Sequence, residues 1–391
     1  MKKQKILITA SYYASFIAMG ISMSSLGPTL PDLAQNTRAT LSAISILFTA
    51  RALGSLAGSV LGGRIYDHLR GHQVMAIMIV AMAGLTALTP FVPLLWLLTA
   101  VLFITGAVQG VLNIGGNALL VWVHGPDVGP FMNGLHFCFG LGTFITPVII
   151  AQFIARDGGI TWMYLLLAVL ILPTMAVALL PSPASPMASQ KNSAAKISPR
   201  LIILIALVFG CYSGASLAFG GWIFTYATQM NLTNQTNAAY LTSVFWGALT
   251  LGRLAAIPLA IRFKPQAILR ADFFGALLSL LAMLIWPKSL AAVMFTCAGL
   301  GFALASIYPT TMSLSGQIMP ISGKVTGLFS IGNSAGSMLI PWIIGQFFES
   351  AGPQSMAVVL IIDMLLALFV LLALARQIAQ PQSAPVPGGI A

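Results

Sequence analysis

The chain has 391 residues, of which 58% are hydrophobic and only 6% charged, and its formal net charge is +11. Soluble domains carry roughly 25% charged residues, so this composition excludes a water-facing globular protein. The basic residues lie in short segments between apolar runs and form no clustered patch for a groove, so nucleic acid is not an expected partner. The expected surroundings are a lipid bilayer.

Twelve apolar runs are each long enough for a membrane-spanning helix, which needs ~20 mostly apolar residues. An all-α membrane protein is therefore predicted, with spans at 5–30, 40–66, 73–91, 94–123, 129–155, 160–180, 200–229, 238–262, 266–286, 289–314, 322–348 and 354–377. A stretch rich in Pro, Ser and Ala separates six spans from six, as a flexible linker does. The expected domains are an N-terminal six-helix bundle (1–180), a cytoplasmic linker (181–199), a C-terminal six-helix bundle (200–378) and a disordered tail (379–391).

Lys and Arg are distributed unequally between the two sides. With the N-terminus inside, thirteen fall on the cytoplasmic side, and three, Arg38, Arg156 and Lys288, fall outside. This bias predicts a multi-pass protein of the cell inner (plasma) membrane with both termini in the cytoplasm. Arg51 and Arg253 fall within spans, where a charge needs a partner or a wet cavity. Each either pairs at the interface between the halves, or contacts solute or forms part of a gate.

The two halves repeat each other in sequence. Tyr12, Ala18 and Gly20 recur 200 residues later, and Arg51 and Arg253 occupy similar places in their halves. At an offset of 194, Gly142, Pro147, Ile149, Ile150, Gln152 and Phe153 match Gly336, Pro341, Ile343, Ile344, Gln346 and Phe347. Two parallel six-helix halves that rock around a midplane site are the architecture of major facilitator transporters.

The loop at 62–72, GGRIYDHLRGH, resembles the major facilitator signature between spans two and three. Its glycines are expected to let span 40–66 pack closely on span 322–348. Gly63, Asp67 and Arg70 are assigned to a conformational latch on the cytoplasmic side, together with Arg51 and Arg253 as gating candidates. His68 stands where arginine is usual, which indicates a subfamily. The alternative is an ordinary basic loop.

Polar side chains recur along the fourth and fifth spans. Gln109, Asn113 and Asn117 are spaced by four and share a helical face, and Asn133 and His136 follow. Carboxamides at bilayer depth need partners or water, and they donate to and accept from the hydroxyls of a sugar. The alternatives are hydrogen bonds between helices and, for His136, plain packing. If functional, His136 binds solute or carries a proton.

The seventh span offers aromatic residues one turn apart, Trp222 and Tyr226, which can stack on a sugar ring. An interfacial aromatic belt is the alternative. Asn333 is a further second-half candidate, with Tyr308 and Thr311 as lesser ones. The predicted substrate-binding set is Gln109, Asn113, Asn117, Asn133, His136, Trp222, Tyr226 and Asn333.

Three stretches, 113–125, 133–142 and 220–227, resemble the fucose:proton symporter branch of the major facilitator superfamily, closest to sodium-dependent glucose transporter-like members. The resemblance implies the twelve-helix fold of two pseudo-symmetric bundles, alternating access, a hexose-like cargo and a monomer. Members often carry a glutamate where this chain has Ser216, and span 94–123 also lacks an acid. Coupling is therefore left open between a facilitator, Na⁺ held by neutral oxygens, and H⁺ carried by His136.

The leading hypothesis is secondary active or facilitative transport of a small polar solute, most simply a monosaccharide. A drug or metabolite exporter of the same superfamily is the alternative, since Met and Phe residues suit an apolar pocket. A membrane enzyme or sensor is a third hypothesis, but no nucleophile–base set, metal-ligand spacing or phosphate loop supports it. No enzyme activity, metal or cofactor is expected, apart from a coupling ion, H⁺ or Na⁺.

Overall fold

A computed structural model describes residues 2–156, 159–183, 198–319 and 323–379, and these residues contain helices but no strand. The α-helices are α1 (Lys2–Ser24), α2 (Leu26–Thr37), α3 (Leu41–Ile44), α4 (Ile46–His68), α5 (Gly71–Leu88), α6 (Leu95–His124), α7 (Gly129–Ile154), α8 (Ile160–Ile171), α9 (Pro199–Gln229), α10 (Gln235–Arg262), α11 (Pro265–Ile285), α12 (Leu290–Leu304), α13 (Ile307–Ile318), α14 (Gly323–Phe348) and α15 (Ser355–Ala379). Three 3₁₀ helices accompany them, η1 (Thr89–Phe91), η2 (Gly125–Val128) and η3 (Leu172–Leu179).

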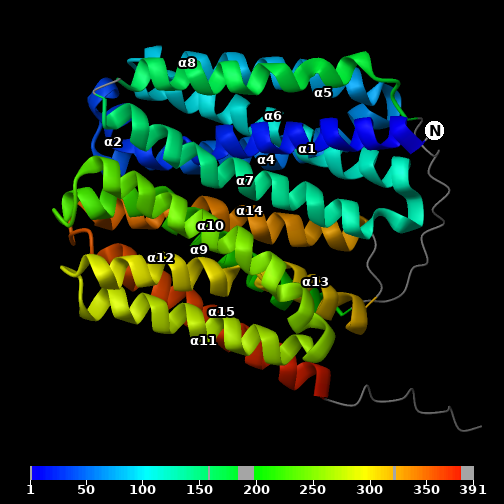
Figure 1. Ribbon diagram of the computed structural model, residues 1–391. Coiled ribbons are helices and arrows are strands. Elements are labelled where there is room, and N and C mark those ends of the chain that lie inside the picture. Colours follow the sequence, from blue (N-terminus) through cyan, green and yellow to red (C-terminus); the bar gives the residue numbers. More distant parts are fainter. Residues whose placement is uncertain (1, 157–158, 184–197, 320–322, 380–391) are drawn as a thin grey trace, which may run out of the picture.

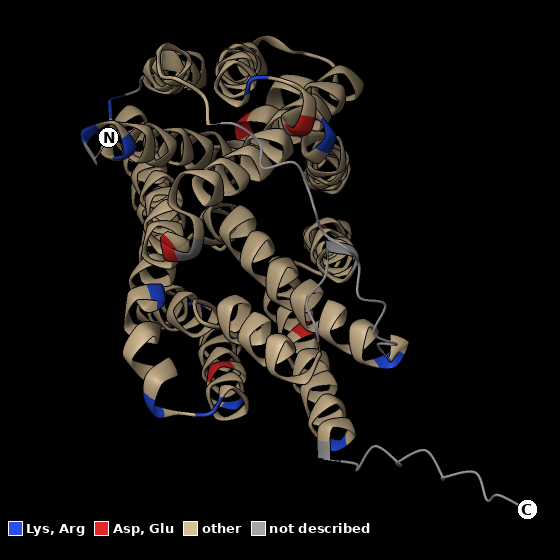
Figure 2. Cartoon of the chain, turned by 90° about the vertical axis from the view of Figure 1, so that its right-hand side faces the viewer, with Lys and Arg blue, Asp and Glu red and all other residues tan. Residues whose placement is uncertain are grey.

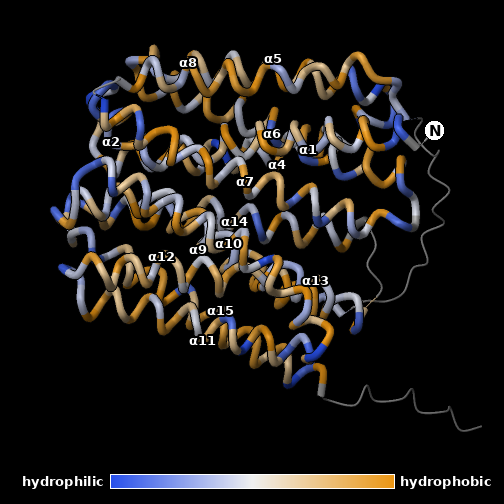
Figure 3. The backbone as a smooth tube through the Cα atoms, viewed as in Figure 1, coloured by the Kyte–Doolittle hydropathy of each residue, from blue (hydrophilic) through white to orange (hydrophobic). Residues whose placement is uncertain are grey.

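Twelve described helical segments are long and apolar enough to cross a membrane, and they coincide with the twelve predicted spans. Figure 3 shows the apolar residues along the helices and hydrophilic residues at many of their ends. Most of the predicted linker, residues 184–197, lies outside the described residues, and so does the segment 380–391 of the predicted tail. The multi-pass membrane class follows from these segments alone.

Two of the described spans are interrupted where proline removes a backbone donor. Pro28 cannot donate to the carbonyl of Ser24, and the first span breaks between α1 and α2. The chain stays helical to Thr37, beyond the predicted end of this span. Pro309 likewise cannot donate to Ala305, and the tenth span breaks between α12 and α13. Breaks of this kind leave carbonyls that other groups must satisfy.

Six spans form each half, and the halves repeat the same pairings. In the first half α1 packs along α7 and α4 along α6, while in the second α9 packs along α14 and α10 along α12. Figure 1 shows the first half above the second, with α7, α10 and α14 where the halves meet. Contacts between halves join α7 to α10 and α4 to α14. The sequence repeat is therefore a repeat of helix packing.

The two faces of the molecule are named here by the chain. The amino-terminal side carries the N-terminus and the 69–70 connection, and Figure 2 looks onto it, with Lys and Arg at several helix ends. The distal side carries the connections at 38–40, 230–234 and 349–354. Because each span crosses once, these two sides correspond to the two surfaces of a membrane.

Glycines bring α4 and α6 into backbone contact, which corrects one expectation. A Cβ on Gly54 or Gly58 would collide with the carbonyl oxygen of Phe103 or Ala107, both on α6. Gly62 faces Val111 of α6 at 3.2 Å, and Gly63 has no neighbour within 4 Å. Gly54, Gly58 and Gly62 thus pack α4 onto α6, whereas the expected partner was the span of α14.

The glycine contact predicts a stability difference. Gly58→Ala places a methyl group against the Ala107 carbonyl, so we expect it to lower stability by ~1–3 kcal/mol through overpacking. Gly84→Ala on α5 is the matched control, since a Cβ there meets nothing within 4 Å. Thermal unfolding of the purified proteins should rank Gly58→Ala below wild type and Gly84→Ala at or above it. Equal midpoints would contradict the close approach of α4 to α6.

Candidate functional site

The two halves are joined on the distal side by a pair of glutamines at repeat-equivalent positions. Gln346 of α14 accepts from the Ser42 hydroxyl at 2.9 Å and donates to the Ser45 hydroxyl at 3.2 Å. Gln152 of α7 donates to the Tyr240 hydroxyl of α10 at 2.5 Å. Each bond crosses from one half to the other. These residues form what is called here the distal seal.

Trp222 belongs to this seal and does not line an open surface. Its side chain is 0% exposed, its Nε1 donates to the Pro341 carbonyl at 3.0 Å, and its ring stacks on Phe348. Phe48 of the first half contacts it from the other side, with ring centroids 6.0 Å apart. Tyr226 is also buried, with its hydroxyl 3.5 Å from the Pro287 carbonyl. Both predicted sugar contacts thus lie in dry packing in this conformation.

Toward the amino-terminal side the seam between α7 and α10 becomes accessible. Gly140 and Thr250 are in close contact. One turn before Gly140 on α7, toward the amino-terminal side, the side chain of His136 is exposed. Its ring lies edge-on to Phe16 of α1, with centroids 6.1 Å apart. The imidazole of His136 lies close enough to the guanidinium of Arg253 on α10 for their charges to interact. His136 therefore lies accessible beside α1 and the second half, and the set of accessible side chains on this side of the seam is called here the cleft.

Arg253 is only partly buried, and its partners lie on the second-half side of the same cleft. Its Nη2 donates to the hydroxyl of Tyr212 on α9 at a long 3.4 Å. Tyr212 packs near Tyr308 of α13, with ring centroids 6.0 Å apart, and Tyr308 is 42% exposed. Sequence analysis did not assign Tyr212 to the site, and its only signal there was its equivalence to Tyr12 in the internal repeat. The second-half wall of the cleft is thus a guanidinium flanked by two phenols.

The predicted carboxamides divide between this cleft and the protein interior. Asn113 and Asn133 are exposed, and the amide of Asn117 donates to the Asn113 side chain at 2.7 Å. Asn333 of α14 is partly exposed, and its carbonyl accepts from Ser337 at 2.8 Å. Gln109 is buried. The helical face predicted from spacing by four is therefore accessible at its 113–117 end only.

Gln109 is a structural partner of Arg51. Arg51 donates from Nε to the Gln109 carboxamide oxygen at 3.1 Å, and from Nη1 and Nη2 to the carbonyls of Met23 and Ser22 at 2.9 and 3.1 Å. These carbonyls belong to the last turn of α1, where the helix is broken. A cation there satisfies orphan carbonyls and complements the helix dipole. The side-chain hydrogen bonds of Arg51 to described residues therefore all lie within the first half, which they hold together.

The predicted latch is disengaged. Asp67 and Arg70 are exposed at the amino-terminal end of the seam between α4 and α14, and Asp67 has no side-chain hydrogen bond or ion pair in the described part of the chain. Gly63 has open space around it. The latch therefore stays a prediction, and the hydrogen bonds between the halves named above lie at their distal ends.

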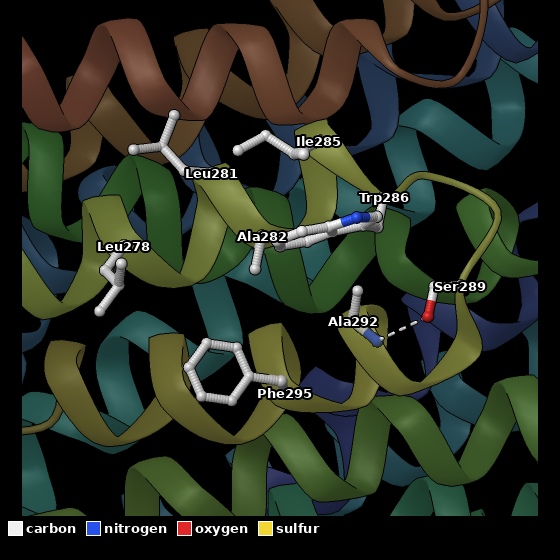
Figure 4. A pocket seen from close by; sticks show the side chains of 8 residues that line it. All are labelled: Leu278, Leu281, Ala282, Ile285, Trp286, Ser289, Ala292 and Phe295. Carbon is white, nitrogen blue, oxygen red and sulfur yellow. Dashed lines mark hydrogen bonds between the residues drawn. The ribbon is translucent and has the colours of Figure 1, made fainter.

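One hollow lies elsewhere, between α11 and α12, and does not suit a polar solute. It has a volume of about 640 Å³. Figure 4 shows its lining of apolar side chains from the two helices, with Trp286 at one end and the Ser289–Ala292 hydrogen bond beside it. Hydrocarbon matches such a surface, so the polar cleft between the halves is the better candidate site.

Comparison with known proteins gives one consistent family. The chain matches the Major Facilitator Superfamily over residues 12–322. It is 29% identical to the mouse sodium-dependent glucose transporter 1A over 85% of this chain and 88% of that one. It is 30% identical to the human sodium-dependent glucose transporter 1, over 85% and 72%. Among solved structures, the nucleoside transporter NupG matches with a TM-score of 0.73 at 13% identity, over 96% of this chain and 99% of that one. A bacterial homologue of the human lysosomal transporter Spinster matches with a TM-score of 0.71 at 13% identity, over 97% of each chain.

The cleft predicts a pattern of thiol accessibility along α7. In a background without Cys138, Cys211 and Cys297, we expect His136→Cys to react with a hydrophilic maleimide because that position faces water. Thr143→Cys on the same helix is the matched control, since Thr143 is 0% exposed. Each variant is labelled in the folded and then in the denatured state, and mass spectrometry gives the labelled fraction of its thiol. Equal labelling of both folded variants would remove the basis for the cleft.

Proposed function

The chain belongs to the major facilitator superfamily, and from this premise we propose that it carries a monosaccharide across the inner (plasma) membrane by alternating access. The observation that carries the proposal is the pairing of a polar, accessible cleft on one side of the seam with a closed seal on the other. Such a state is one half of an alternating-access cycle. The transport is secondary active or facilitative.

The orientation follows from the Lys and Arg bias. With thirteen basic residues on the amino-terminal side and three on the distal side, the N- and C-termini lie in the cytoplasm. The described conformation is then inward-facing. The two moving bodies are residues 1–180 and 200–378, joined by the linker 181–199 and followed by a tail at 379–391. The protein works as a monomer.

A sugar suits the chemistry of the cleft. Asn113, Asn117 and Asn133 offer carboxamides that donate to and accept from hydroxyls, and the exposed Tyr308 offers an aromatic face. The names of the mouse and human relatives give the same cargo class. Asn333 and His136 complete the site. Trp222 and Tyr226 become sugar contacts only in the outward-facing state, after the distal seal has opened, while Gly63, Asp67 and Arg70 then close the cytoplasmic side.

Na⁺ is the coupling ion that the relatives' names favour. Neutral oxygens of the cleft would hold it, since the pathway carries no described carboxylate. A proton carried by His136, or no coupling at all, are the other outcomes of the same flux measurement.

Uptake of labelled hexoses into proteoliposomes, with and without Na⁺ and across pH, tests the proposal. We expect saturable uptake that unlabelled hexose competes away. A Na⁺ requirement at constant pH would identify the ion. The absence of hexose flux and of hexose binding in folded protein would contradict the cargo class.

The distal seal also predicts a reversible lock. A Cβ on Gly345 would lie closer to the Ser45 Cβ than the ~3.5–4.5 Å between disulfide-linked Cβ atoms, so a small shift lets Ser45→Cys and Gly345→Cys form a bond. Oxidation should hold the halves together at the distal side and stop uptake, and a reductant should restore it. Each single variant, compared with its own reduced form, is the control. Undiminished uptake by the cross-linked protein would contradict opening at this seal.

A further inference from the structure

The two arginines within spans occupy repeat-equivalent positions but differ in how their charge is satisfied. Arg51 donates to three acceptors, Gln109 and the two carbonyls that end α1. Arg253 donates to a single neutral hydroxyl, that of Tyr212, at 3.4 Å. A guanidinium has five N–H donors, so most donors of Arg253 are without a protein partner in the described part of the chain. Its position in the cleft leaves them available to a solute.

The acidic residues do not supply a counter-ion to Arg253. Within the described residues, Asp363 is buried on α15 beside Cys211, Asp272 accepts from Ser306, and Glu349 accepts from the Leu41 amide on the distal side. The others are Asp32 on α2 and two exposed residues near the amino-terminal side, Asp67 and Asp127, while Asp157 lies outside the described residues. The titratable neighbour that interacts electrostatically with Arg253 across the cleft is His136, a potential second cation.

An uncompensated cation at bilayer depth is unfavourable. Water in the cleft lowers this cost, but a ligand that carries the missing negative charge removes it. We propose that the cargo is a monosaccharide bearing one carboxylate, a sugar acid of the hexuronate class, whose carboxylate pairs with Arg253. This rests on the proposed function and specifies its substrate class.

The chemistry of the site favours a carboxylate over a phosphate. A guanidinium fork matches the two oxygens of a carboxylate in a bidentate pair. A phosphate monoester carries about −1.5 to −2 charge at neutral pH, which one fixed cation does not balance. Across the cleft, Asn113, Asn117 and Asn133 remain for the ring hydroxyls. The site therefore separates a charge-binding wall on α10 from a hydroxyl-binding wall on α6 and α7.

The test compares D-glucose with D-glucuronate, two hexoses of similar size that differ in the carboxylate. Purified full-length wild type, Arg253→Gln and Arg262→Gln are titrated with each sugar and followed by thermal shift, because a bound ligand raises the unfolding temperature. Arg262 is an exposed arginine at the end of the same helix and serves as the matched control. If Arg253→Gln does not fold, Arg253→Lys keeps the charge and loses the fork.

We expect wild type and Arg262→Gln to bind glucuronate more tightly than glucose. Arg253→Gln should weaken glucuronate binding by about tenfold or more, as loss of a charge-assisted hydrogen bond does, and should weaken glucose binding by a smaller factor. Equal affinities of wild type for the two sugars, or an unchanged glucuronate affinity in Arg253→Gln, would overturn the sugar-acid assignment while monosaccharide transport stands. Loss of binding and flux for both sugars in wild type would overturn both.

Discussion

An arginine at bilayer depth must be either paired or wet, and that constraint organises the polar part of the molecule. Arg51 is the paired case. The break after α1 leaves carbonyls without backbone donors, and the guanidinium donates to two of them. Its Nε donates to the carboxamide oxygen of Gln109. The same constraint makes the accessible side chains informative. His136 and Asn113 lie exposed toward the cleft instead. Polar residues with a structural role thus bond to other protein groups, whereas the candidate functional residues are left accessible.

The internal repeat explains why the distal seal has two similar halves. Gln152 and Gln346 occupy equivalent places on α7 and α14, and each reaches a hydroxyl on the opposite half. Duplication thus places the same side chain on both seams, where Gln346 meets serine hydroxyls and Gln152 meets a tyrosine hydroxyl. Because these are neutral hydrogen bonds, the seal can open by a rotation of one bundle against the other.

Much of the fold could be predicted from the sequence, because span length and apolar content are local properties that the bilayer imposes on each segment. Pro28 and Pro309 lie at the helix breaks, a signal that run lengths alone do not use. The direction in which a polar side chain points from its helix was harder to predict. Residues spaced by four turn about 40° per step around a helix, so Gln109 points into the first half while Asn113 and Asn117 reach the cleft. Trp222 was predicted to contact sugar but is buried in this conformation. Its burial depends on which end of the seam between the halves is closed, and no sequence pattern indicates that.

The strength of the contacts on each side bears on how cargo drives the cycle. A neutral hydrogen bond is worth about 0.5–1.5 kcal/mol net, so the glutamine bonds of the distal seal can break and re-form within the energies of a transport cycle. A ligand shifts such an equilibrium only by its differential affinity for the two states. Arg253 lies beside the seam between α7 and α10, about one turn from the contact of Gly140 with Thr250. A solute that binds both this arginine and the carboxamides of α6 and α7 joins the two halves across the cleft. Binding energy at that point opposes separation on the amino-terminal side, and therefore favours closure there and opening of the seal at the other end.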